Sequence, residues 1–425
     1  MELLGKSRAE LREWLAGMGE PAYRGDQIYR ALYQEWNFEI ANMTVLPAAL
    51  REKLAREATI TLPTVRQKYF SKDGSVRYLF GLGDERKEKD NAETQRGAEK
   101  KERANTEDTE KRKAKKSFEK RPASVEAVWM PSESRQTICI STQAGCAVDC
   151  QFCMTAQLGL IRNLTAGEIV GQILVALKEN EEGKDSASFV PQDKGAQGSL
   201  EKAGERERAN TGDTESKSTE KKQTNVVLMG QGEPLLNFDN VMAAMRIVLD
   251  PKGVGLAPKH VTLSTSGIVP GIERLAKEPV RPKLAISLNA SNDDQRNVLM
   301  PINKKYPLKE LLAACKKFPT GSREYITFEY VLLGGVNDTA EDARRVARLV
   351  SGLGRVKVNL IPWNPGALPY KEPTEEAIAE FHRILLEKGV PAFTRYSRGR
   401  DVMAACGQLA LGEMKSPRSA VISIQ

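Results

Sequence analysis

The sequence predicts an α/β protein whose parallel sheet is closed or partly closed as a (β/α)6 barrel, with a small helical N-terminal domain and two disordered insertions. Three observations support this fold class. From residue 125 onward, apolar β-rich runs alternate with helical patterns, which is typical of parallel sheets. Helical patterns and one hairpin precede this region, and two further segments are highly charged and poor in core-forming residues.

The first 83 residues are expected to form an accessory domain of short helices that ends in a β-hairpin. Ser7 is a candidate cap for the helical run that follows it, and Ile28, Leu32 and Trp36 recur on one face of a second helix. A third helical run precedes two β-rich runs joined by a turn signal at residues 72–74. The arginines and tyrosines of this domain fit either a solvated face or a contact with RNA.

Residues 84–121 and 182–224 form the two expected insertions. The first has 14 basic and 11 acidic residues with no Ile, Leu or Val, and the second has 8 basic and 9 acidic residues. They share a repeat, ERANTEDTE from Glu102 and ERANTGDTE from Glu207. Such segments bury too little apolar surface to offset the entropy of ordering, so we expect both to be disordered, as surface-loop expansions or RNA-binding tails.

The third domain, residues 122–425 apart from the second insertion, is expected to hold the barrel. Six runs are expected to be its strands: QTICIS, NVVLMG, HVTLSTS, KLAISLN, REYITFEYVLL and KVNLIP. Its helices are expected near residues 165–180, 237–249, 268–277, 308–318 and 339–351. In such sheets the active site lies at the carboxyl ends of the strands. The motifs that directly follow these runs are therefore the candidates for chemistry.

The composition limits the classes of function. The formal net charge is +8 over 425 residues and the pI is about 9.0, which suits an anionic partner such as RNA without proving one. No stretch approaches the roughly 20 apolar residues of a membrane span, so we expect a cytoplasmic protein with no membrane partner. The sequence has only two histidines, His260 and His382, which excludes a histidine-rich metal site.

Cys146, Cys150 and Cys153 carry the strongest chemical signal. Three thiolates on one loop can hold a 4Fe-4S cluster, which normally takes four cysteines, and would leave one iron open to a small-molecule chelate. The alternatives are plain buried thiols or a zinc site, which Cys139 or Cys406 would have to complete. The sixth cysteine, Cys315, lies in a helical pattern and matches no chemical role.

The cysteine loop and the βα pattern together resemble the radical S-adenosylmethionine (SAM) superfamily. In that superfamily the open iron chelates the methionine part of SAM, and an electron from the cluster cleaves SAM to a 5'-deoxyadenosyl radical. Gly232, Glu233 and Pro234, after the second barrel strand, are similar to the GEP motif, whose carboxylate receives the SAM amino group. The resemblance implies a 4Fe-4S cluster and SAM as cofactors.

Further motifs resemble the RlmN/Cfr family: SVEAVWMP, TICISTQAGCAVDCQFCMTAQLGLIRNLTAGEIVGQI, VVLMGQGEPLLNFDNV, VTLSTSG, MPINKKYPL, LIPWNP and RGRDVMAACGQL. The resemblance to its RlmN branch implies a methyltransferase that acts on carbon 2 of an adenine in the peptidyl transferase centre of 23S rRNA and in the tRNA anticodon loop. Two alternatives stay open. One is a Cfr-type enzyme that methylates carbon 8, and the other is a non-catalytic iron-sulfur protein that binds RNA.

The family mechanism implies roles for three residues. Carbon 2 of adenine is electron-poor and does not attack the methyl group of SAM, so in this family a cysteine first takes the methyl and a second SAM supplies the radical that activates it. Cys406 is similar to the methylated cysteine, and Cys139 to the cysteine that releases the RNA adduct by forming a disulfide. Glu126 matches the general base proposed to remove the carbon-2 proton.

The resemblance also implies further SAM contacts and partners. The additional contacts are Ser264, Ser287, Leu288, Asn289 and Asn364. The family commonly has His where Asn289 stands, so a polar contact is retained there and an aromatic ring is lost. The implied partners are 23S rRNA, tRNA and an electron donor such as flavodoxin. We expect a monomer whose N-terminal domain helps to grip RNA.

Overall fold

The computed structural model describes residues 1–83, 123–182 and 222–409. The first expected insertion and most of the second lie outside these ranges. Helix α6 (Ala166–Glu182) and strand β7 (Gln223–Leu228) nevertheless occupy both ends of the range 182–224, so that expected insertion was too wide. The polar start of β7 gave no strand signal, and it is its parallel pairing with strand β4 (Arg135–Cys139) that extends the backbone there.

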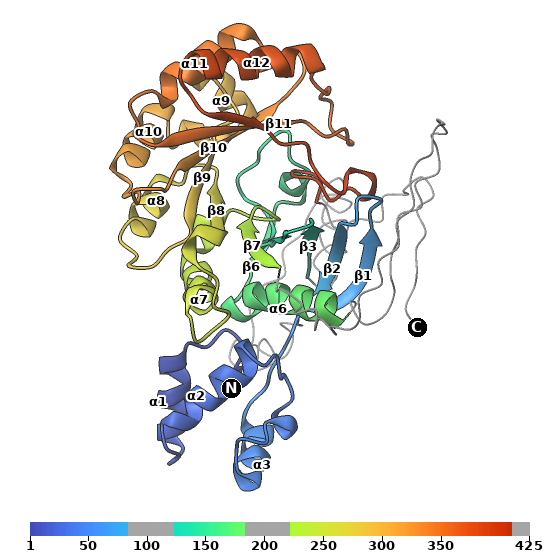
Figure 1. Cartoon of the computed structure of the whole chain (residues 1–425), viewed down its shortest axis with the longest axis vertical. Coiled ribbons are helices and arrows are strands. Elements are labelled where there is room, and N and C mark those ends of the chain that lie inside the picture. Colours follow the sequence, from blue (N-terminus) through green and yellow to red (C-terminus); the bar gives the residue numbers. More distant parts are fainter. Residues whose placement is uncertain (84–122, 183–221, 410–425) are drawn as a thin grey trace, which may run out of the picture.

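Within the described residues, ten strands form one sheet in the order β1-β2-β3-β4-β7-β8-β9-β10-β11-β12 (Figure 1). The strands not yet given are β1 (Thr64–Phe70), β2 (Val76–Gly81), β3 (Ser124–Pro131), β8 (Val261–Thr265), β9 (Lys283–Ser287), β10 (Ile326–Leu332), β11 (Val356–Pro362) and β12 (Ala392–Thr394). Neighbours are antiparallel up to β4 and parallel from β4 to β12. The six expected barrel strands are confirmed. Strand β12 was not predicted, because three residues are too few to show a repeating apolar pattern.

Helices follow the parallel strands and lie on the outer side of the sheet (Figure 1). They are α7 (Phe238–Leu249), α8 (Val269–Leu275), α9 (Asp293–Leu299), α10 (Leu308–Lys317), α11 (Ala340–Val350) and α12 (Glu375–Glu387). Together with α6 this confirms the five expected helices and the α/β class. The sequence analysis did not include α9 and α12. None of the described helices is both long and apolar enough to cross a membrane.

The N-terminal helices α1 (Arg8–Gly17), α2 (Tyr23–Tyr33) and α3 (Ala48–Glu57) lie beside α6, apart from the sheet (Figure 1). The expected cap is confirmed, because the Ser7 side chain accepts from the Glu10 backbone and the Glu10 side chain accepts from Ser7 in return. Ile28 and Leu32 are buried on α2 as predicted, whereas the placement of Trp36 on the same helix is wrong, because α2 ends at Tyr33 and Trp36 has a φ of 49°. The Tyr29 hydroxyl donates to Asp250 over 3.0 Å, so the helical unit is tied to the loop after α7.

The hairpin of β1 and β2 differs from the expectation in its place. It was assigned to the accessory domain, but β2 pairs with β3 along its whole length and the hairpin continues the barrel sheet. Local sequence shows a hairpin and its turn, whereas the strand it pairs with lies beyond the first insertion. Only residues up to α3 therefore form a separate helical unit.

Candidate active site

The cysteine loop is closed by a small hairpin of strands β5 (Gln143–Gly145) and β6 (Leu160–Asn163). The Cys146 amide donates to the Gly159 carbonyl oxygen over 3.0 Å. Gly145 has a φ of 72°, and a Cβ there would lie 1.8 Å from the same oxygen, so this position requires glycine. The hairpin thus fixes both ends of the loop.

A cavity of about 170 Å³, the main cavity, lies at the carboxyl ends of the barrel strands. Ten predicted site residues line it: Cys146, Cys150, Cys153, Gly232, Glu233, Ser264, Ser287, Asn289, Asn364 and Cys406. Leu288 is fully buried beside it and does not reach the cavity wall. Parallel strands point their ends to one edge, and this is why motifs far apart in sequence meet here.

The three loop thiols share the wall of the main cavity. Burial raises the pKa of Cys146 to about 12 and also raises the pKa of Cys150 and of Cys153. Among the described residues, no group of three or more His, Cys, Asp or Glu side chains is gathered tightly enough for a single metal ion. The thiols therefore hold their protons, and a bound metal group would have to displace them.

Glu233 is held by a dense set of hydrogen bonds. One carboxylate oxygen accepts from the Ser266 amide and hydroxyl over 2.6 and 2.7 Å, and the other accepts from the Leu235 amide over 3.0 Å. Burial raises the pKa of this carboxyl, while the bonds from Ser266 act in the opposite direction. Its backbone amide donates to Gln143, so Glu233 is also tied to the hairpin that closes the cysteine loop.

Asn289 occupies a conformation that few residues adopt. Its φ is 54°, in the left-handed region where asparagine is tolerated. Its side-chain oxygen accepts from the Val331 amide over 2.9 Å, and its amide group lies 3.4 Å from the Met300 sulfur. The amide thus joins β9 to β10 while the residue lines the main cavity, so the replacement of the family's usual His leaves a well-bonded side chain.

The remaining polar wall comes from neighbouring strand ends. The hydroxyls of Ser264 and Ser287 lie 3.4 Å apart, and Asn364 donates to Ser397 over 2.9 Å. Phe152 also lines the cavity, and its carbonyl oxygen accepts a 3.5 Å contact from the Trp363 ring nitrogen. These side chains place several hydroxyl and amide groups in the wall of the main cavity, next to the apolar ring of Phe152.

Cys406 lies between the main cavity and a second cavity of about 180 Å³. Cys139 lines the second cavity, together with Arg395, Tyr396 and Arg398. Cys406 is exposed because it lines both spaces, yet the protein around its thiol raises its pKa to about 11. Burial, followed by the nearby Cys406, raises the pKa of Cys139 as well. All six cysteines are free thiols, so the predicted disulfide is not formed in this state.

The loop that carries Cys406 is anchored from two sides. Toward the cysteine loop, the Met154 amide donates to the Gly407 carbonyl over 2.7 Å. Toward the β1–β2 hairpin, the Ser71 hydroxyl donates to Asp401 over 2.6 Å, and the Gly399 amide donates to Asp73 over 2.9 Å. Figure 1 shows this loop over the ends of the N-terminal strands. The hairpin therefore helps to hold Cys406 in place.

Glu126 lines neither cavity. It is buried on β3, forms an ion pair of 3.0 Å with Arg77, and accepts a 3.4 Å hydrogen bond from Gln231. The Arg77 guanidinium stacks over the Tyr69 ring at 4.1 Å and reaches the Met403 carbonyl oxygen at 3.5 Å. Glu126 thus belongs to a network that touches both the Gly232 motif and the Cys406 loop.

The sequence analysis missed Glu329, a carboxylate in the wall of the main cavity. It is buried on β10, where it accepts from Asn359 over 3.0 Å, and burial raises its pKa to about 7. The strand around Glu329 is mostly apolar, so a carboxylate within an apolar run was the only signal in the sequence that could have indicated this residue. It is near enough to Cys406 to contribute to the raised pKa of that thiol.

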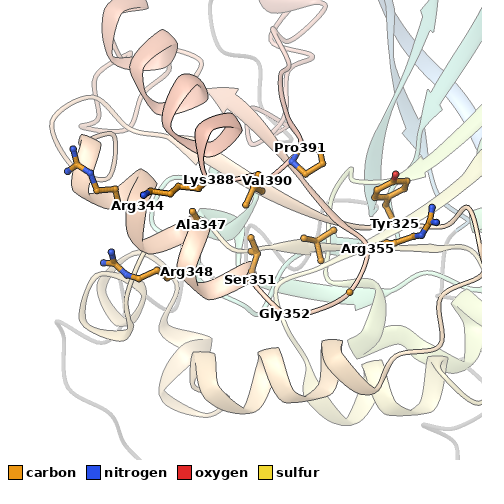
Figure 2. A pocket seen from close by; sticks show the side chains of 14 residues that line it. Tyr325, Arg344, Ala347, Arg348, Ser351, Gly352, Arg355, Lys388, Val390 and Pro391 are labelled. Atoms are coloured by element: carbon orange, nitrogen blue, oxygen red, sulfur yellow. The ribbon is translucent and has the colours of Figure 1, made fainter.

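A larger hollow of about 550 Å³ lies at the opposite, amino-terminal edge of β10 and β11. Figure 2 shows Arg344 and Arg348 on α11 facing Lys388, with Arg355 and Tyr325 on the other side. It contains none of the predicted site residues. Arg344 and Arg348 are paired with Glu341 over 3.4 and 3.0 Å.

Comparison with known proteins identifies the family. Residues 1–60 match the ribosomal RNA large subunit methyltransferase N-terminal domain, and residues 140–350 match the radical SAM superfamily. The chain is 42% identical to a probable dual-specificity RNA methyltransferase RlmN of Koribacter versatilis, over 93% of this chain and 98% of that protein. The chain belongs to the RlmN family. It is also 38% identical to the RlmN of Geobacter sulfurreducens, over 96% and 92% of the two chains.

A solved structure agrees with this RlmN assignment. The radical SAM methyltransferase of Sphaerobacter thermophilus matches with a TM-score of 0.75 and 37% identity, over 96% of this chain and 99% of that one. The RlmN-family chain is therefore a radical SAM RNA methyltransferase, and the non-catalytic alternative is wrong. The superfamily implies SAM and an iron-sulfur cluster. Three free thiols that share the main cavity with several hydroxyl and amide side chains fit those groups.

Proposed function

We propose that this enzyme methylates carbon 2 of an adenine in 23S rRNA and in tRNA, with Cys406 as the carrier of the methyl group. The observation that carries the proposal is that Cys406 lines both cavities. A carrier has to meet the methyl donor on one side and the acceptor on the other. Here the Cys406 thiol adjoins the main cavity, which the cysteine loop lines, and also the second cavity, which Cys139 lines.

Cys146, Cys150 and Cys153 would hold a 4Fe-4S cluster. Residues that end or follow the neighbouring strands at the main cavity would hold SAM. When bound, these groups supply a methyl group and a carbon-centred radical. The residues proposed for SAM are Gly232, Glu233, Ser264, Ser287, Leu288, Asn289 and Asn364. The hydroxyls, amides and carboxylate of this set can bind the amino acid and ribose parts of a nucleoside sulfonium.

The second cavity would take the adenine. Enzymes that act on a base in RNA take it out of the stack into a pocket. Arg395, Tyr396 and Arg398 line the entrance, and the Tyr396 side chain is half exposed, so phosphate and base contacts are both available. Cys139 on the same wall would attack the sulfur of Cys406: an S–S bond forms, the bond between that sulfur and the methylene carbon of the adduct breaks, and the carbon takes up a proton to become the methyl group of the released base.

Glu126 is the proposed acceptor of the carbon-2 proton, through an intervening water, because its side chain lines neither cavity. Its ion pair with Arg77, at 3.0 Å, fixes the position of the carboxylate on β3. Gln231, which donates to Glu126, directly precedes Gly232, so the carboxylate is linked to the wall of the main cavity. We further propose a cytoplasmic monomer, reduced by an electron donor such as flavodoxin.

The test is anaerobic reconstitution with iron and sulfide, followed by reaction with SAM, a reductant and either 23S rRNA or tRNA that lacks the modification. Mass spectrometry of the digested RNA should show 2-methyladenosine. Detection of 8-methyladenosine instead would assign the enzyme to the Cfr type. Formation of 5'-deoxyadenosine without any methylated adenine would refute adenine as the acceptor.

A further inference from the structure

Arg296 is a fully buried arginine whose charge has no carboxylate in contact. Its side chain is 0% exposed on α9. The guanidinium donates to the carbonyl oxygens of Ser266, Ser287 and Leu288 over 2.6, 3.1 and 3.1 Å and to the Asn303 side chain over 3.0 Å. All four acceptors are neutral. Among the ion pairs of the described residues, none includes Arg296.

A buried charge that is only hydrogen-bonded to neutral groups is costly, so its negative counterpart should be sought nearby. Burial lowers the pKa of Arg296 to about 10, and Cys150 is the foremost group acting in the other direction, ahead of Asp293 and Cys315. Asp293 uses its carboxylate to accept from Asn303 and from the Leu308 amide. The position of Cys150 is therefore the main place for a balancing negative charge.

The cysteine loop packs directly on the helix that carries Arg296. The Gln151 amide donates to the Leu299 carbonyl oxygen over 3.0 Å. Cys150 packs against the apolar group that includes Leu299 and Met300, at the end of the same helix. In return, the Arg296 charge lowers the pKa of the Cys150 thiol, against the larger effect of burial. Arg296 thus lies on the helix against which the cysteine loop packs.

We propose that Arg296 is the fixed counter-charge of the iron-sulfur cluster and makes the cluster easier to reduce. This inference rests on the proposed three-cysteine 4Fe-4S cluster. An oxidised core with two positive charges and three thiolates is a monoanion, and uptake of one electron makes it a dianion. A buried cation stabilises the dianion more than the monoanion, so it raises the reduction potential.

The same side chain also acts as a positioning residue. Its carbonyl partners follow or end β8 and β9, and Ser266 is the residue that holds Glu233. Arg296 therefore joins the cluster loop to two strand ends of the proposed SAM site. Charge and geometry can be separated, because lysine keeps the charge but cannot reproduce four fixed hydrogen bonds.

The experiment is a redox titration of the reconstituted cluster, followed by electron paramagnetic resonance, with SAM affinity measured in parallel. Arg296→Gln should make reduction at least tenfold less favourable, which is 59 mV for one electron. Arg296→Lys should stay closer to the wild-type potential while SAM binding weakens. Arg355→Gln, in the hollow of Figure 2, removes a distant guanidinium and should change neither. An unchanged potential in Arg296→Gln overturns the proposal.

If Arg296→Gln does not fold or does not bind the cluster, a second variant tests the same proposal. The exchange Asp293→Asn with Asn303→Asp keeps the net charge and moves a carboxylate to the atom position that accepts from Arg296. This variant should lower the potential in the same direction, and a wild-type potential in it would overturn the counter-charge. A wild-type protein without any cluster signal would instead refute the proposed function itself, and the inference with it.

Discussion

Burial is the largest electrostatic influence on the ionisable side chains in and around the main cavity. It raises the pKa of Cys406 to about 11 and of Glu329 to about 7, and it lowers the pKa of Arg296 to about 10. The protein thus shifts each of these groups toward its neutral form. Reactivity at neutral pH therefore depends on what the cavity contains, since a bound cation favours the thiolate and a bound anion favours the guanidinium.

Replacing Cys406 tests the methyl carrier. Cys406→Ala should abolish methylation, because no thiol that borders both cavities remains, while cluster loading is kept. Transfer of labelled methyl from SAM to RNA is the measurement. Cys315→Ala is the matched control: it removes a buried thiol outside both cavities and should cost about 1 kcal/mol of stability while leaving transfer intact. Methylation by Cys406→Ala would contradict the assignment.

Replacing Cys139 should arrest the reaction later. Cys139→Ala leaves Cys406 able to join the RNA but removes the neighbouring thiol on the wall of the second cavity. We expect a covalent complex of protein and RNA that survives denaturing electrophoresis. Cys139→Ala combined with Cys406→Ala should not form it. Loss of turnover without that complex would count against release by Cys139.

Glu329 should make stability depend on pH. Its pKa in the folded state, about 7, lies above the ordinary value of 4.5, so the folded protein keeps a proton that the unfolded chain loses. Stability should fall as the pH rises through that window and then level off, by about 3 kcal/mol in total. Urea unfolding of the metal-free protein should show this fall in the wild type and a smaller one in Glu329→Gln, where Glu233 still has a raised pKa. The exposed substitution Glu13→Gln should leave the fall in place.

The residues found by sequence and those that were missed differ in a physical way. The cysteine loop and the glycine motif have fixed local spacings, so they can be recognised from the sequence alone. Arg296 and Glu329 do not, because a charged residue on a short helix or a strand is usually solvated. Their burial depends on neighbours contributed by other strands, which no local pattern contains.

At the scale of elements, the β5–β6 hairpin is the part that shapes the cysteine loop. Gly145→Ala would place a methyl carbon 1.8 Å from the Gly159 carbonyl oxygen and force the hairpin apart. We expect loss of cluster incorporation, measured by iron content and absorbance. Gly159→Ala is the matched control, since its φ is also positive, at 62°, but nothing lies within 4 Å of the added carbon. Because its ψ is −179°, this backbone conformation strongly favours glycine, so Gly159→Ala should cost about 1–3 kcal/mol but still bind the cluster.

Strands and helices with long apolar runs or repeats could be predicted from the sequence, whereas short or polar elements could not. The six barrel strands could be read from the sequence because both of their faces are covered, which gives continuous apolar runs. The start of β7 is polar, and α9 has only seven residues, so neither could be distinguished from a loop. Yet α9 carries Arg296, the proposed counter-charge of the cluster.

At the scale of the whole molecule, the tip of the β1–β2 hairpin supports the Cys406 loop. Asp401→Ala removes the acceptor of the Ser71 hydroxyl and of the Lys72 amide. Methyl transfer should fall by about 10²-fold because the thiol is no longer held in position, while SAM affinity stays the same. Asp239→Ala, a control on an exposed side chain that pairs with Arg274, should alter neither. A wild-type transfer rate in Asp401→Ala would show that the hairpin does not position the thiol.

This contact also explains why the sequence misplaced the hairpin. A turn signal shows that two strands pair with each other, but it does not show that their other edge joins β3. The partners in the loop of Cys406 are more than 320 residues away in the chain. Long-range pairing of this kind sets the domain boundary, and it lies outside what local periodicity can predict.

The distance in sequence between the hairpin tip and the Cys406 loop has a consequence for biosynthesis. A chain still emerging from the ribosome already carries the three loop thiols, but the segment that completes the pocket is synthesised much later. Until that segment docks on the hairpin, the unfinished enzyme lacks the positioned thiol that is proposed as its methyl carrier.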